Sequence, residues 1–242
     1  MIRFLTASAA AIALFSAAAV SADSFAPPSV QTATSPSGSV VVTVIPAMLS
    51  CAASESDCEP AARAIVEFDR GGMRGPSRTV RLRNREAPGY ALVTDDGERL
   101  VTVNDYASAG FGDNVLVVYD ERGEVIANHA LADFLPEEYI NGLPRTASTL
   151  RWWSAPVRLL PGTRQAIVSV YAADGSGDFS GQATDGIELR LDLDTGAIER
   201  PSGPEWQAAR ACALATPWMV PDAGAEAQRA RFGEICRESG GR

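Results

Sequence analysis

Lysine is absent from this chain of 242 residues, and all 21 of its basic residues are arginine. This absence excludes Schiff-base chemistry on a lysine amine and catalysis by a serine–lysine pair. Histidine occurs once, at His129, which excludes histidine-rich metal sites and leaves one imidazole that can act as a base. The chemistry open to the chain is therefore mainly that of carboxylates, hydroxyls and guanidinium groups.

Positive charge is scarce relative to negative charge. Thirty acidic residues against 21 basic ones give a formal net charge of −9. A general nucleic-acid binder carries a basic footprint, and simple adhesion to anionic lipid also needs one. We therefore expect neither a nucleic-acid partner nor electrostatic attachment to a membrane surface.

Long apolar runs are scarce too, and the longest lies at the N-terminus. Arg3 precedes an apolar run over residues 4–20, and Val-Ser-Ala follows at 20–22. This layout predicts a cleavable secretory signal over residues 1–22, with an uncleaved membrane anchor as the alternative. The run is shorter than the ~20 residues of a membrane-spanning helix, and no second such segment follows. We expect an exported protein, periplasmic or secreted, without a membrane span after cleavage.

The four cysteines are read in the light of that export. In an oxidising compartment they predict two disulfide bonds rather than free thiols. Four cysteines allow three connectivities, and the simplest joins Cys51 to Cys58 and Cys212 to Cys236. A zinc site is the alternative, but these pairs are spaced more widely than the short pairs of a zinc knuckle.

The remaining chain is expected to form a single, mainly β domain over residues 38–242, after a flexible lead-in at 23–37. Short apolar segments separated by Gly, Pro and Asp turns predict an antiparallel meander. The predicted strands span 39–45, 64–68, 78–83, 91–93, 100–103, 115–119, 124–128, 156–160, 165–171, 187–193 and 197–199. Helices are predicted at 133–143 and in a C-terminal helical segment over 204–238, where they span 204–213 and 222–237.

One unit of turn, strand, loop, strand, turn and strand recurs at 91–128 and 156–199, and in part at 35–68. Its turns and strands include Ser-Pro-Ser-Gly at 35–38, Thr-Asp-Asp-Gly at 94–97, VVYDERGEV at 117–125 and LDLDTGAI at 191–198. These segments resemble the strand-turn signatures of WD40-like β-propeller repeats in exported bacterial proteins. The resemblance implies propeller-like sheets.

The chain departs from that pattern in two ways. It has about three units, whereas closed propellers usually have four or more blades, and it lacks the Gly-His and Trp-Asp pairs. A partial propeller, an open twisted sheet and an unrelated sandwich remain alternatives.

No catalytic motif is evident. His129 lies in the sequence ANHALADF, but the G-x-S-x-G pattern of a nucleophilic serine is absent. A lone histidine is more often a surface or packed residue than a base. Carboxylate pairs for glycoside hydrolysis depend on separation in space, which an acid-rich sequence does not give. We predict no catalytic residue.

One acidic loop has the character of a metal site. Asp174, Asp178 and Asp185 place hard oxygen ligands on a Gly-rich segment, which favours calcium, although the EF-hand register is missing. A solvated loop is the alternative, and no other cofactor is indicated. Asp105, Asp113 and Asn114 occupy the equivalent loop of the preceding unit, so the two loops are expected to line one rim.

A cluster of arginines is the most unusual charge feature of an acidic chain. We predict a partner-binding strand formed by Arg74, Arg78, Arg81 and Arg83. Strand alternation places Arg81 and Arg83 on one face, and guanidinium groups match carboxylates and phosphates. The alternative is a solvated strand face neutralised by the chain's own acids, such as Glu55, Asp57 and Glu59.

Together these features predict a binding or scaffolding module of the cell envelope. Its partner is expected to be an envelope protein or an anionic ligand, bound by rim loops or by the arginine strand. An extracytoplasmic hydrolase is the alternative class, and a structural protein without a small ligand is the third.

Overall fold

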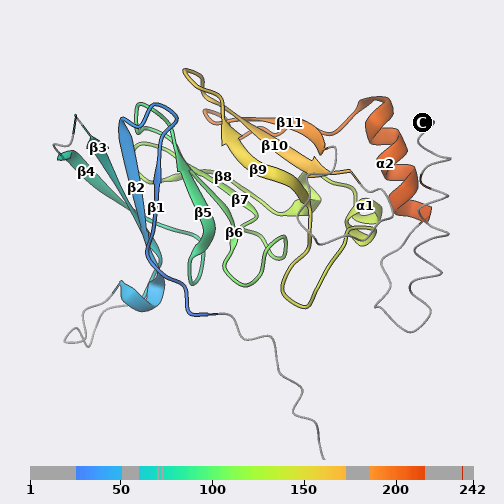
Figure 1. The fold of residues 1–242 in the computed structure, drawn as a ribbon, viewed down its shortest axis with the longest axis horizontal. Coiled ribbons are helices and arrows are strands. Elements are labelled where there is room, and N and C mark those ends of the chain that lie inside the picture. The colour runs from blue at the N-terminus through green and yellow to red at the C-terminus, as the bar shows by residue number, and fades with distance from the viewer. Residues whose placement is uncertain are drawn as a thin grey trace, which may run out of the picture.

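The computed structural model describes residues 26–50, 60–69, 71, 74–172, 186–215 and 236. These residues form three antiparallel sheets, two α-helices and two short 3-10 helices (Figure 1). The prediction of a mainly β chain with helices near its C-terminus is confirmed. Among the described residues, no helix is both long enough and apolar enough to span a membrane.

Each sheet is a meander in which neighbouring strands follow one another in the sequence. The first sheet contains β1 (Gln31–Thr34), β2 (Val40–Ile45), β3 (Arg63–Asp69) and β4 (Arg74–Arg81). The second contains β5 (Pro88–Val93), β6 (Leu100–Asp105), β7 (Leu116–Tyr119) and β8 (Val125–His129). The third contains β9 (Trp153–Leu159), β10 (Gln165–Tyr171) and β11 (Gly186–Asp192).

The sheets pack face to face in series, so the second sheet is buried on both sides. Leu100 and Val117 enter the core shared with the first sheet, whereas Val101 and Leu116 enter the core shared with the third. Successive side chains on a strand point to opposite faces, so a strand between two cores must be apolar at every position. This explains the unbroken run Val115–Tyr119, all of it buried.

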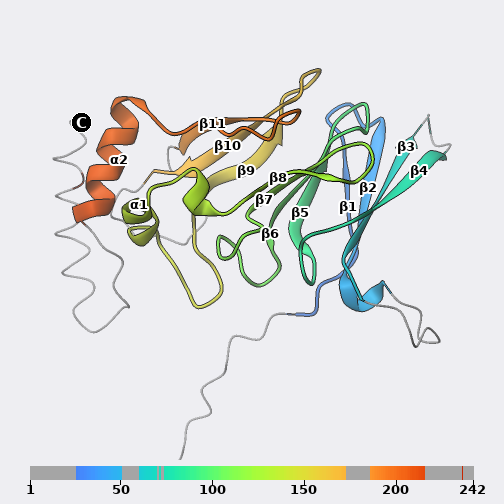
Figure 2. The ribbon, with the colours of Figure 1, turned by 180° about the vertical axis from the view of Figure 1, so that it is seen from behind.

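The first strands of the three sheets lie next to one another, and the sheets fan out from them (Figure 2). β5 is joined to β9 by a hydrogen bond from the Val157 amide to the Tyr90 hydroxyl, at 2.8 Å. Burial raises the pKa of Tyr90 to about 12, although that bond opposes the shift. Tight turns lie at one end of the fan and longer loops at the other.

The two α-helices lie beside the third sheet and contribute to the core that it shares with the second sheet (Figure 1). The helix α1 (Glu137–Asn141) packs against α2 (Gly203–Ala215), where the rings of Tyr139 and Trp206 lie 4.5 Å apart. The predicted disulfide between Cys212 and Cys236 is present. Both cysteines are buried in the core, so the bond ties α2 to the C-terminal region.

Three predicted elements differ from the structure. β1 forms within the predicted lead-in, because residues 31–34 pair with β2 along its length. The predicted strand at 197–199 is reduced to one bridge between Leu191 and Ile198. The predicted helix at 133–143 is divided at Pro136 into a 3-10 helix (Leu131–Asp133) and α1, since proline cannot donate the hydrogen bond that would continue a helix.

Several predictions fall outside the described residues. They are the signal at 1–22, the start of the lead-in, the pair Cys51 and Cys58, the candidate metal loop with Asp174, Asp178 and Asp185, and the helix at 222–237 apart from Cys236.

Candidate functional site: the turn rim

Tight turns from all three sheets meet at one end of the fan, which we call the turn rim. It comprises residues 35–39 from the first sheet, 94–99 and 120–124 from the second, and 160–164 and 193–196 from the third. Antiparallel meanders put alternate connections at the same end, so sheets stacked in register bring their turns together. Turns on a rigid scaffold are a common place for ligand binding.

Short-range hydrogen bonds hold these turns in shape. In the turn after β5, Asp96 Oδ1 accepts from Thr94 Oγ1 at 2.6 Å and from the Glu98 amide at 2.9 Å. Gly97 adopts a φ of 68°, in the left-handed region that favours glycine. After β11, Asp192 Oδ1 accepts from the amides of Asp194 at 3.0 Å and Thr195 at 2.8 Å. The side chains at the rim are thus carried on fixed backbone.

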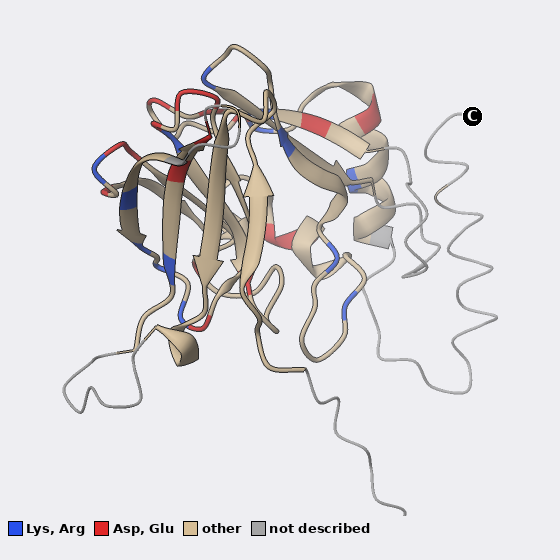
Figure 3. Ribbon diagram, turned by 60° about the vertical axis from the view of Figure 1, so that its left-hand side comes forward, with Lys and Arg blue, Asp and Glu red and all other residues tan. Residues whose placement is uncertain are grey.

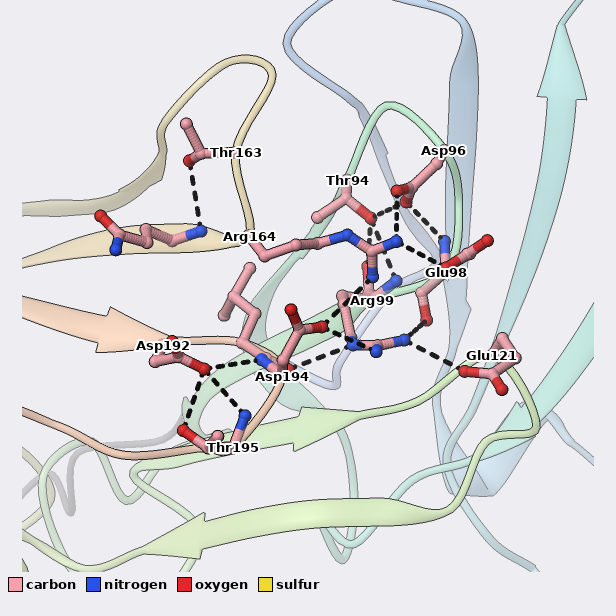
Figure 4. A network of polar contacts seen from close by, with 12 residues as sticks. Thr94, Asp96, Glu98, Arg99, Glu121, Thr163, Arg164, Asp192, Asp194 and Thr195 are labelled. Carbon is pink, nitrogen blue, oxygen red and sulfur yellow. Dashed lines mark hydrogen bonds and ion pairs between the residues drawn. The ribbon is translucent and has the colours of Figure 1, made fainter.

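Two arginines join the second and third sheets across the rim (Figure 4). Arg164, directly before β10, reaches the second sheet with its Nη2 at 2.7 Å from Asp96 Oδ2 and 2.5 Å from Glu98 Oε2. Arg99 reaches the third sheet, with Nη2 at 2.8 Å from Asp194 Oδ1. Asp194 lies between the two guanidinium groups, 3.6 Å from Arg164 Nη1.

Arg99 is the more enclosed of the two arginines, with 14% of its side chain exposed. Its Nε donates to the Leu193 carbonyl at 3.1 Å, and its Nη1 contacts Glu121 Oε2 at 3.0 Å. One guanidinium therefore holds three turns in fixed relation. Four carboxylates surround two guanidinium groups, so this network is negative overall.

The pKa shifts follow from these contacts. Partial burial alone would raise the pKa of Asp96, but the bonds from Thr94 and Glu98 and the attraction of Arg164 outweigh it and lower the pKa. Hydrogen bonds from the Thr195 amide and hydroxyl lower the pKa of Asp192. The hydrogen bond to Glu98 raises the pKa of Arg164.

A cleft of ≈310 Å³ opens among the turns of the three sheets. Pro36 comes from the first sheet, Asp95 from the second, and Leu160 and Arg164 from the third. The Asp95 carboxylate is positioned by the Ser37 amide, which donates to Oδ1 at 2.7 Å. Bonds from the side chain and amide of Ser37 lower the pKa of Asp95. The cleft therefore combines apolar walls with an ionised carboxylate and a guanidinium.

The network predicts an acid sensitivity that depends on Arg164. Folding lowers the pKa values of Asp96 and Asp192, so their stabilisation is present above an ordinary aspartate pKa of 3.8 and is lost as pH falls through the lower folded values. In Arg164→Gln, Asp96 loses one cause of its shift. We expect the free energy of unfolding of the variant to be about 1 kcal/mol lower than that of wild type at pH 7. On acidification, the free energy of unfolding should then decrease less in the variant than in wild type.

Thermal unfolding followed by circular dichroism between pH 7 and about pH 3 measures this difference. Arg190→Gln is the control, because Arg190 donates to Gln165 on the exposed side of the third sheet. Equal acid dependence in Arg164→Gln and wild type would contradict the coupling.

The predicted arginine strand is divided between two faces. Arg81 and Arg83 are exposed, whereas the alternate residues Val80 and Leu82 are buried, as strand alternation predicts. Arg78 lies on the inner face, where its Nη2 donates to the Gly97 carbonyl at 2.8 Å. Burial lowers its pKa, against the attraction of two acids of the second sheet, Asp120 and Glu121. The side chain of Arg74 is outside the described set.

The loop of Asp105, Asp113 and Asn114 lies at the end opposite the turn rim. Asp105 Oδ1 accepts from Asn84 Nδ2 at 2.8 Å, and Oδ2 accepts from Asn114 Nδ2 at 3.1 Å. The Asp105 carboxylate is thus engaged in joining two loops. Within the described ranges, no group of three or more His, Cys, Asp or Glu residues is placed to hold a metal ion.

His129 joins two sheets. Its Nε2 lies 2.7 Å from the Gly196 carbonyl oxygen, which can only accept, so Nε2 carries the proton. The contact fixes β8 against the turn after β11, which is a structural role.

Arg99 and Arg164 were not among the predicted site residues, although the repeat contains a signal for them. Each lies two residues after a turn glycine, in Gly-Glu-Arg at 97–99 and Gly-Thr-Arg at 162–164. An arginine at the same place in two units that stack on each other indicates a shared role across their interface.

No protein-family model and no curated protein matches this chain. Among solved structures, one from a study of two prolyl endopeptidases aligns with 13% sequence identity and a TM-score of 0.30. The alignment covers 72% of this chain and 26% of that one, so the chain spans about a quarter of the length of its structural neighbour.

Proposed function

We propose that this chain is an exported binding or scaffolding module of the cell envelope, which binds its partner at the turn rim. The observation that supports the proposal most directly is the convergence of turns from three sheets around one cleft. Turns that are already fixed lose little conformational entropy when a partner binds, and this favours binding. An envelope protein that presents a basic segment is the partner that suits this rim.

The charge of the rim is the reason for that choice. Basic residues are outnumbered by acids on the rim turns, where the acids are Asp95, Asp96, Glu98, Asp120, Glu121, Glu124 and Asp194. A cationic side chain of the partner would meet the ionised Asp95 carboxylate at the cleft, with apolar contact to Leu159 and Leu160. An anionic ligand would instead meet this excess of like charge.

Export is supported by the disulfide between Cys212 and Cys236, since such bonds persist in oxidising compartments. It agrees with the predicted signal at residues 1–22. We place the chain in the periplasm or outside the cell.

The WD40-like relationship is also part of the proposal. The three repeat units of the sequence correspond to the three sheets, and these fan out from adjacent first strands. Blades of a propeller are arranged in this radial way. The hydrolase alternative has only the compartment in its favour.

Crosslinking capture from the native envelope fraction, read by mass spectrometry, tests the rim. We expect crosslinks from the partner to map to the turns at 94–99 and 160–164. Asp95→Arg should lower capture of that partner about tenfold or more, because it reverses the charge at the cleft.

Asp113→Arg is the matched control, since it makes the same charge change on an exposed residue at the opposite end. It should capture as wild type does. Undiminished capture by Asp95→Arg, or crosslinks that map only to the opposite end, would contradict the proposal.

A further inference from the structure

The outward face of the first sheet is a second surface with a defined pattern. Val42, Ala64 and Val66 point inward and are buried against the second sheet. The alternate residues of β2 and β3 point the other way and are half-buried. In Figure 3 this face is turned toward the viewer, and no described element packs over it.

Strand register aligns the outward side chains in three rows that run across the sheet. The row nearest the turn rim contains Thr34, Val41, Glu67 and Ser77. The middle row contains Thr32, Thr43, Ile65 and Thr79. The row at the loop end contains Ile45, Arg63 and Arg81.

The rows differ in charge, and the middle row is neutral. Along β3 the outward residues read Arg63, Ile65 and Glu67, which is positive, apolar and negative. The two charged positions are about 13 Å apart, because a strand rises about 3.3 Å per residue. Two copies of this face are complementary in charge when the strand direction of one copy is opposite to that of the other.

We propose that a second copy of this chain docks on this face in a two-fold symmetric dimer. The symmetry axis lies between the two sheets, perpendicular to the strands and along the middle row. Glu67 then faces Arg63 of the second copy, Arg63 faces Glu67 of the second copy, and Ile65 meets its own equivalent. Each contact occurs twice, as a two-fold interface requires.

The charges select this orientation over the other face-to-face arrangement. With the axis parallel to the strands and along β3, Arg63 would face Arg63 of the second copy, and Glu67 would face Glu67 of the second copy. Like charges placed opposite one another oppose association and so exclude that register. The reversed arrangement places Arg81 opposite Ser77 of the second copy.

Exposed apolar side chains extend the surface at its loop end. Val30, Met48 and Leu49 are 50%, 55% and 49% exposed, and they account for three of the five large apolar side chains that are exposed in the described ranges. Val30 directly precedes β1, and the other two lie in the 3-10 helix (Ala47–Leu49) that follows β2. Apolar surface gathered beside a docking face favours association.

Sedimentation analysis of the purified chain over a range of concentrations tests the dimer. We expect a reversible monomer–dimer equilibrium. Glu67→Arg and Arg63→Glu should each weaken self-association about tenfold or more, because each places two pairs of like charges across the interface. An equimolar mixture of the two variants should associate, since every charged pair is then complementary.

Restoration in the mixture separates a contact between copies from a fold defect, and the double variant with both changes should also dimerise. Arg190→Glu, on the outward face of the third sheet, is the control and should leave the equilibrium unchanged. A chain that stays monomeric at about 200 µM, or a dimer that neither charge reversal weakens, would overturn the proposal; that range covers the affinity of weak interfaces.

A crosslinking measurement keeps the proposal testable if the charge variants fold poorly. Thr43→Cys lies on the axis and should form a covalent dimer with a short bis-maleimide reagent. Val41→Cys lies one row away, where its equivalent is distant, and should not. The reverse result would exclude the proposed axis. The face is separate from the turn rim, so failure of the dimer leaves the rim proposal unaffected.

Discussion

Trp152→Ala is expected to lower the free energy of unfolding by about 4 kcal/mol, the largest effect that we predict for one residue. Trp152 is fully buried between the second and third sheets, and its ring lies edge-on to Phe134 at 6.0 Å. Its Nε1 donates to Asn104 Oδ1 at 2.9 Å. Truncation removes the ring contacts and leaves a cavity that a close-packed core fills only in part.

Equilibrium unfolding in urea, followed by far-ultraviolet circular dichroism, measures this loss. Trp152→Phe is the informative companion, because it keeps one aromatic ring in the core while it removes the donor to Asn104 and part of the indole volume. Asn104 Oδ1 still accepts from the Gly110 amide at 2.9 Å, so we expect a cost of only about 1–2 kcal/mol. Equal losses in the two variants would show that packing of the ring is not what Trp152 contributes.

Gly110→Ala is expected to destabilise the chain by about 3 kcal/mol, through strain rather than lost burial. Gly110 has a φ of 77°, which costs a residue with a Cβ roughly 1–2 kcal/mol. An added Cβ would also lie 2.6 Å from the Leu150 carbonyl oxygen and 2.8 Å from Trp152 Cδ1. Backbone cannot move aside as a flexible side chain does, so the clash adds about 1–3 kcal/mol.

Gly112→Ala is a matched control in the same loop. Gly112 has a φ of 76°, but an added Cβ would have no neighbour within 4 Å. Gly112→Ala should cost only the conformational share, roughly 1–2 kcal/mol. The difference between the two variants in urea unfolding isolates the clash, and equal losses would place the whole effect in the backbone conformation.

Strand positions were predictable because each core leaves a periodic mark in the sequence. The run Val115–Tyr119 is apolar throughout because two cores cover β7, and the segment 78–83 alternates because only one core covers β4. The pair Cys212 and Cys236 belonged to the simplest of the three connectivities that the sequence left open, and the structure contains it. Strand periodicity depends on local sequence, and the expectation of disulfide bonds depends on the cysteine positions and on the expected compartment.

The short strand β1 was not predictable in the same way. Its sequence, Gln-Thr-Ala-Thr, has weak apolar alternation and follows a Ser- and Pro-rich segment. It is a strand because β2 offers a complete edge with which its backbone can pair. Tertiary context of this kind overrides local propensity.

The sequence alone determined the strand period, the turns, the acidic balance and the absence of lysine chemistry. The tertiary structure decided which distant turns meet, because the pairing of Arg99 with Asp194 and of Arg164 with Asp96 depends on how two sheets stack. It also divided the arginine strand, turning Arg78 inward to Gly97 and leaving Arg81 outside. Strand alternation specifies two faces, but only the packing of a second sheet decides which face is covered.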